Sequence, residues 1–222
     1  MLIGKLEELL STSTPFGFSR FNDGEVGGIV ETGFIASRGA QKIDKELRGE
    51  LLTSITHKQP NYWVGIPCSV CYPAYSKVAN ELVGDYEYKT LAVDLINRNY
   101  NLTRDIFKRT LAGKEVYWVG GEDQIVDKVK QEYNFNLVKQ YKLPNTNCFE
   151  YYGSILEEVT NFKDGSIVIL SLGPLERILV KEWFKRNSKI TFLGLGSFFD
   201  PITRNVTHGY HNGTTKKCEV CN

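Results

Sequence analysis

The feature of this sequence that most limits its fold is an alternation of short apolar stretches with amphipathic ones. The stretch SIVILSLGP (166–174) is apolar enough to be a strand buried on both faces, and LERILVKEWFKR (175–186) follows it with helical spacing. KITFLGLGS (189–197) then reads as a further strand. Alternation of this kind predicts a mostly parallel, Rossmann-like α/β sheet with helices on both of its faces.

The same alternation extends over the rest of the chain. We predict further strands at 18–21, 62–67, 88–96, 115–121 and 136–144, and further helices at 5–12, 43–55, 73–84, 102–113, 122–133 and 148–162. No repeat or linker interrupts the 222 residues. We therefore expect one domain, 1–222, that ends in a polar tail at 202–222.

Composition and charge exclude some classes of protein. A formal charge of +1 with 24% charged residues gives no broad basic face for nucleic acid, although a local patch is still compatible with it. No run approaches the roughly 20 apolar residues that span a bilayer. The first residues, MLIGKLEELL, lack the apolar core and cleavage site of a secretory signal. We expect a cytoplasmic enzyme or binding protein without a membrane span.

Four of the five cysteines fall in two C-x-x-C pairs, a spacing that supplies the two halves of a four-thiolate zinc site. We predict a structural Zn²⁺ that fastens the tail 202–222 to the body. Other interpretations stay open: two unrelated thiol pairs, a redox dithiol, disulfides, which an intracellular location disfavours, or a site in which His208 and His211 join the tail cysteines. The four paired cysteines are Cys68, Cys71, Cys218 and Cys221.

Glycines follow three of the predicted strands, at the edge where a parallel sheet binds its ligands. They lie in Gly120-Gly121, in Gly173-Pro174 and in Gly194-x-Gly196-Ser197. Glycine lets a ligand approach the backbone, and the amide N–H groups of a following helix attract anions. Each junction alone is ordinary loop chemistry, but three at one edge favour a nucleotide or phosphate. The chain has neither G-x-G-x-x-G nor a P-loop lysine, which disfavours dinucleotide and ATPase sites.

The stretch FSRFNDGEVGG (18–28) places Asp23 and Glu25 just behind the first strand. Two carboxylates at this spacing suit Mg²⁺ or Mn²⁺, with diphosphate oxygens as further ligands. Arg20 could bind the same phosphates bidentately. The alternative is a helix start capped by Asn22 or Asp23, with Glu25 in its first turn. Spacing alone slightly favours the helix start.

The motif SRFNDGEVGGI resembles the R-F-G-D-G-E signature of the GT-D glycosyltransferases, a metal-dependent family that uses nucleotide sugars. YWVGIPC, LPNTNCFEYYGSILEEV and VILSLGPLERILVKEW are similar to further motifs of that family in the same order, and the resemblance covers about residues 16–201. The chain departs from the family pattern where Glu, Asp, His and Thr are common in the family. The residues at those positions are Gly120, Gly194, Ser197 and Asn97.

The resemblance implies transfer of a sugar from a nucleotide diphosphate, UDP, to an acceptor hydroxyl with the help of Mn²⁺ or Mg²⁺. Asp23 and Glu25 would hold the ion, and Arg20 would contact phosphate. The family pattern places Asn147, Gly173 and Pro174 in the donor pocket, and position alone adds Gly120, Gly121 and Gly196. Asp200, in the FFDP stretch, is our candidate general base, with Glu122 and Asp123 as further candidates.

The sequence leaves the sugar, the acceptor and the oligomeric state open. We favour a glycan acceptor, and a modified nucleobase in nucleic acid stays possible. Two other functions compete with sugar transfer. One is a zinc-fastened binding module without chemistry, and the other is a metal-dependent phosphoesterase, for which Asp23 and Glu25 supply few ligands.

Overall fold

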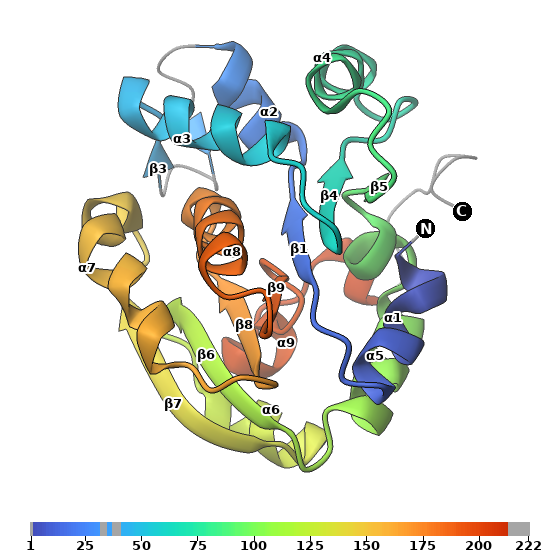
Figure 1. Ribbon diagram of the computed structural model, residues 1–222, viewed down its shortest axis with the longest axis vertical. Helices are drawn as coiled ribbons and strands as arrows, with labels where there is room; N and C mark the ends of the chain where they lie inside the picture. Colours follow the sequence, from blue (N-terminus) through green and yellow to red (C-terminus); the bar gives the residue numbers. More distant parts are fainter. Residues whose placement is uncertain (1, 32–34, 37–40, 213–222) are drawn as a thin grey trace.

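A single parallel sheet runs through the centre of the molecule (Figure 1). The computed structural model describes residues 2–31, 35–36 and 41–212. The strand order in the sheet is β5-β4-β1-β9-β8-β6-β7. The strands are β1 (Gly17–Arg20), β4 (Tyr62–Ile66), β5 (Lys89–Leu91), β6 (Glu115–Gly121), β7 (Asn136–Leu143), β8 (Ile167–Ser171) and β9 (Thr191–Gly194). The predicted α/β class with a parallel sheet is confirmed.

Helices cover both faces of this sheet. One face carries α2 (Asp23–Val30), α3 (Lys45–Thr56), α4 (Pro73–Val83), α7 (Tyr152–Leu156) and α8 (Pro174–Arg186). The other carries α1 (Ile3–Ser11), α5 (Tyr100–Thr110), α6 (Val126–Tyr133) and α9 (Asp200–Thr203). Within β8, Val168 packs into the first core and Ile169 into the second. Both faces of the strand are therefore buried, which explains its continuous apolar sequence.

The order of the strands creates a switch point in the middle of the sheet. The chain starts at β1, adds β4 and β5 on one side, and then builds the other half so that β9 pairs with β1. In doubly wound sheets, ligands bind outside the carboxyl ends of the strands at this point. A short antiparallel pair, β2 (Ile35–Ala36) with β3 (Gln41–Lys42), lies beside α2 and was not predicted from the sequence pattern.

The strand predicted at 88–96 is wrong in its second half. β5 ends at Leu91, and a π-helix follows at Asp94–Arg98. The cause is Asp94, a fully buried carboxylate that accepts from Thr90 Oγ1 at 2.9 Å and from the Ile3 N–H at 3.2 Å. The first of these bonds closes a turn where the apolar pattern indicates extended chain.

The helix predicted at 148–162 is also interrupted. A 3-10 helix at Cys148–Tyr151 leads into the short α7, and a second 3-10 helix covers Glu157–Asn161. The Leu156 carbonyl accepts from the Trp183 indole N–H at 2.9 Å. In a continuous α-helix that carbonyl would accept from an amide one turn later, so a long-range partner replaces the local one.

The zinc prediction lies partly outside the described residues, because the tail pair Cys218 and Cys221 falls there. Of the other pair, Cys68 is buried and Cys71 is exposed, between β4 and α4. Within residues 2–31, 35–36 and 41–212, no three His, Cys, Asp or Glu side chains come together as a metal site. The zinc site stays a prediction. The same residues contain no helix that is long and apolar enough to cross a membrane.

Candidate active site

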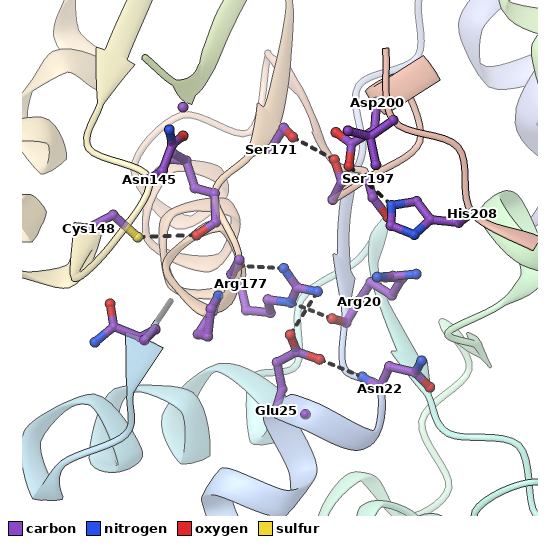
Figure 2. A pocket seen from close by; sticks show the side chains of 18 of the residues that line it. Arg20, Asn22, Glu25, Asn145, Cys148, Ser171, Arg177, Ser197, Asp200 and His208 are labelled. Atoms are coloured by element: carbon purple, nitrogen blue, oxygen red, sulfur yellow. Dashed lines mark hydrogen bonds and ion pairs between the residues drawn. The ribbon is translucent and has the colours of Figure 1, made fainter. Parts of the chain in front are cut away.

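A cleft of about 640 Å³ opens at the carboxyl ends of β1, β6, β8 and β9. Figure 2 shows side chains from these different parts of the chain pointing into it. Most of the catalytic and donor-binding residues predicted from the sequence line the cleft, but Asn147, Gly120 and the alternative base Glu122 do not. The predicted residues that line it are Arg20, Asp23, Glu25, Gly121, Gly173, Pro174, Gly196 and Asp200. The alternative base Asp123 also lines it.

Asn147 is the first predicted residue that is absent from the lining. It precedes a 3-10 helix in the left-handed conformation, with φ 49°. Its neighbours Asn145 and Cys148 line the cleft instead. The Cys148 thiol donates to the Leu172 carbonyl at 3.2 Å, and burial raises its pKa to about 11, so it is not a thiolate at neutral pH. The motif therefore predicted the correct segment of the chain, but not which of its side chains line the cleft.

Gly120 is the second predicted residue that is absent from the lining. Because it has no side chain, it leaves room for Gln124 behind the cleft. A Cβ there would lie 1.9 Å from Gln124 Oε1. That oxygen accepts from the Trp118 indole at 2.8 Å, and the Gln124 amide donates to Ser171 Oγ at 2.8 Å. The Ser171 hydroxyl then donates to the Gly196 carbonyl at 2.6 Å. This buried chain of bonds joins the ends of three strands.

We expect Gly120→Ala to destabilise the protein by about 1 to 3 kcal/mol, because the added methyl group overpacks Gln124 and disrupts its bonds. The free energy of unfolding in urea measures this. Gly153→Ala is the matched control, since nothing lies within 4 Å of a Cβ at that α7 position. It should leave stability unchanged or raise it by up to about 1 kcal/mol. Equal losses of unfolding free energy in the two variants would contradict the role of Gly120 in leaving room for Gln124.

Two helix starts and one arginine line the cleft. α2 begins after its N-cap Asn22, and α8 begins at Pro174 after Gly173, which adopts φ 57° and ψ −141°, a conformation that only glycine adopts readily. Arg20 Nη1 donates to Asn97 Oδ1 at 3.3 Å. A Cβ at Gly196 would lie 3.2 Å from Arg20 Nη2. The positive ends of two helices and a guanidinium therefore favour an anion here.

A buried ion-pair cluster joins these groups, and sequence reasoning missed its central member, Arg177, which also lines the cleft. Its guanidinium donates to the Arg20 carbonyl at 2.6 Å and to the Gly173 carbonyl at 2.5 Å. Glu25 Oε1 lies 3.0 Å from Nη2, and the fully buried Glu176 contacts Nη1. Burial raises the pKa of Glu176 although Arg177 opposes the shift. An arginine in the first turn of a helix, directly after the Gly-Pro turn, was the only signal in the sequence.

The two carboxylates of the Asp-x-Glu motif have different surroundings. Glu25 lies in the first turn of α2 and accepts from the Asn22 N–H through Oε2 at 2.9 Å, so the predicted helix start is confirmed. Both oxygens of Glu25 are thus engaged by protein groups. Asp23 is half-buried and lines the cleft. Burial raises its pKa, and the charge of Glu25 adds to the effect. Of the two side chains, Asp23 is the one that fits a divalent cation.

The opposite wall of the cleft is held together by Arg204. Its guanidinium donates to Asp123 Oδ1 at 2.9 Å, to Asp200 Oδ1 at 3.2 Å and to Asn145 Oδ1 at 3.3 Å. The second oxygen of Asp200 lies 3.3 Å from His208 Nε2. These contacts join the ends of β6 and β7 to α9 and to the chain that follows it.

The last described segment packs against the same wall. The Tyr210 hydroxyl lies 2.6 Å from Ser197 Oγ, and the Tyr210 ring stacks on His208 at 5.6 Å between centroids. The segment 202–212 therefore contacts the cleft through its own side chains.

His211 in this segment predicts a pH dependence of stability. Burial and the neighbouring His208 lower the His211 pKa to about 4 from its usual 6.5, and Nδ1 already accepts from the His208 N–H at 2.9 Å. Below pH 6.5 the unfolded chain therefore binds a proton that the folded chain refuses, so stability falls as the pH drops toward 4. The urea midpoint of wild type should decline over this range, and that of His211→Phe should decline less. Parallel slopes for the two proteins would contradict this.

The fold is that of a doubly wound parallel α/β protein with a cleft at its switch point. No family model and no curated protein matches the sequence. Solved structures of a domain of unknown function, number 1792, do share its fold.

One of these is described as highly conserved with a distinct glycosyltransferase fold; it is 18% identical with TM-score 0.68, over 98% of this chain and 83% of that chain. A selenomethionine form of that domain is 16% identical with TM-score 0.69, over 98% and 83%. A third, from Streptococcus sanguinis and described as a new glycosyltransferase, is 16% identical with TM-score 0.67, over 97% and 85%. At these identities the chain shares the fold, and the similarity establishes no activity.

Proposed function

We propose that this protein is a glycosyltransferase that moves a sugar from a UDP-sugar to an acceptor hydroxyl, with a divalent cation as cofactor. The observation that carries the proposal is the convergence, in one cleft, of Arg20, two helix starts and the carboxylate of Asp23. Positive groups and a carboxylate together suit a diphosphate with its Mg²⁺ or Mn²⁺. The shared fold and the resemblance to GT-D enzymes support the same function.

The groups of this chain have separable roles in such a reaction. Arg20 and the amide groups at the start of α8 would bind the diphosphate and stabilise the charge that develops on it as it leaves. Asp23 would hold the cation, which supplies Lewis-acid stabilisation of the leaving diphosphate when bound. The acceptor oxygen forms a bond to the anomeric carbon of the sugar, and the bond from that carbon to the diphosphate oxygen breaks.

The proton of the acceptor hydroxyl needs a base if the reaction inverts configuration. Asp200 is our proposed base for two reasons. It lines the cleft, in the wall that Arg204 holds together, and its Oδ2 makes only a long contact, 3.3 Å, with His208. Arg204 holds the other oxygen in place. A glycan hydroxyl is the acceptor that we favour.

Thermal unfolding with UDP and Mn²⁺ tests this function. UDP at about 100 times its dissociation constant should stabilise the protein by about 2.7 kcal/mol and raise the melting temperature by about 5 to 10 °C. The rise should need Mn²⁺ and disappear in Asp23→Ala. A binding module would be indifferent to UDP, and a phosphoesterase would release phosphate from simple esters; either result would sink the proposal. Metal-dependent hydrolysis of a panel of UDP-sugars would then identify the donor.

A further inference from the structure

The two acidic residues of the Asp-x-Glu motif do different work in this structure. We propose that Glu25 is a positioning residue that clamps Arg177 between the two turns facing the donor diphosphate, and that Asp23 is the member of the motif that ligates the divalent ion. The assignment of the ion rests on the proposed function. The clamp itself rests on contacts alone and can be tested without any ligand.

Both carboxylate oxygens of Glu25 already have protein partners. Its side chain is only 9% exposed, and its two oxygens meet the Asn22 N–H and the Arg177 guanidinium at 2.9 and 3.0 Å. Figure 2 shows the carboxylate between these two partners. Direct metal ligation by Glu25 would compete with the capping bond of α2 and with the ion pair to a buried arginine.

Arg177 connects the ends of two different elements through their backbone carbonyls. Its side chain is 2% exposed, and it donates to the carbonyl of Arg20 at the end of β1 and to that of Gly173 in the turn before α8. These two positions carry the groups that face the anion: the Arg20 side chain and the amide groups at the start of α8. Arg177 therefore sets the spacing of the diphosphate site from below, and Glu25 joins α2 to it.

The carboxylate of Asp23 has different surroundings from that of Glu25. Asp23 is half-buried and lines the cleft, and among the described residues its carboxylate forms no ion pair. A divalent ion beside Asp23 would supply the counter-charge that this carboxylate lacks. Glu25 has its cation already, in Arg177. The same motif thus supplies one carboxylate without an ion pair and one that Arg177 and the Asn22 N–H hold in place.

The binding experiment compares the affinity for UDP in Mn²⁺ with the affinity in EDTA. The ratio of the two dissociation constants reports the coupling between metal and nucleotide. Asp23→Asn should bring this ratio to about 1, which means no coupling between metal and nucleotide. Glu25→Gln should keep it within about threefold of wild type while weakening UDP binding in EDTA by about tenfold, because the turns shift. Glu31→Gln, an exposed glutamate just after α2, is the matched control and should change neither value.

The stability experiment tests the clamp without ligand, through a double-mutant cycle of Glu25→Gln and Arg177→Met. Glu25→Gln alone should lower the melting temperature by roughly 5 to 10 °C, because it removes one of the two counter-charges of a buried arginine and leaves only Glu176. The double variant should lose less than the sum of the two single losses, since Glu25 and Arg177 each lose the same partner; the loss of the cation beside Glu176 is common to both Arg177→Met proteins and cancels in the cycle. Should a variant fail to fold in buffer, the cycle is measured in trimethylamine N-oxide, which favours compact states.

Two results would overturn the proposal: loss of the Mn²⁺ ratio in Glu25→Gln as complete as in Asp23→Asn, or strictly additive losses in the cycle. A wild-type protein that binds no UDP in Mn²⁺ would instead refute the proposed function. In that case the cycle decides the clamp by itself: a double loss smaller than the sum of the single losses supports it, and additivity refutes it.

Discussion

Replacing Arg177 with methionine is expected to lower the free energy of unfolding by about 3 to 5 kcal/mol, the usual cost of breaking a buried ion pair. Methionine fills much of the same volume, so the loss is electrostatic and not a cavity effect. Without Arg177, the buried carboxylates of Glu25 and Glu176 lose their shared cation, and two backbone carbonyls lose their donor. Equilibrium unfolding in urea measures the change.

The matched control is Arg186→Met on the same helix, α8. Arg186 pairs with Glu157 at 3.0 Å, but the two side chains are 36% and 70% exposed. Solvent screens such a pair, so the variant should lose less than about 1 kcal/mol. A loss for Arg177→Met as small as the control's would show that the buried cluster is not a framework for the cleft.

Asp23→Asn is expected to lower kcat/KM for sugar transfer by about 10²- to 10³-fold, the size of effect seen when one preorganised electrostatic contact to the transition state is removed. The variant should nevertheless fold at least as well as wild type. Burial and the charge of Glu25 raise the pKa of Asp23, which means that the fold disfavours its ionised form. A neutral amide removes that penalty. Activity and thermal unfolding should therefore move in opposite directions.

Asp127→Asn provides the comparison, because Asp127 also lies in the first turn of a helix, α6, but is exposed and outside the cleft. It should retain activity and lose only a few tenths of a kcal/mol of stability through the helix dipole. Transfer activity that survives in Asp23→Asn, or a large loss of stability in that variant, would exclude Asp23 as the residue that serves the donor.

Local patterns in the sequence identified the fold class because strands and helices repeat their side-chain directions within a few residues. The strands at 115–121 and 166–174 and the helix at 175–186 are found almost where the apolar period predicts them. Where local prediction failed, a partner distant in the chain intervened. Asp94 ended a strand by binding Thr90 and the start of α1, and Trp183 took the carbonyl that a longer α7 would have used.

The candidate site divides in the same way. The sequence by itself determined a parallel sheet with glycine turns at its carboxyl edge and an acidic motif behind the first strand, since these follow from neighbouring residues. Only the tertiary structure decided that Glu25 pairs with Arg177 while Asp23 does not, and that Asn145 lines the cleft where Asn147 was expected. The physical reason is that the backbone conformation of a residue is set mainly by its neighbours in the sequence. Its charge partner and its burial are set by elements that meet only when the sheet has formed.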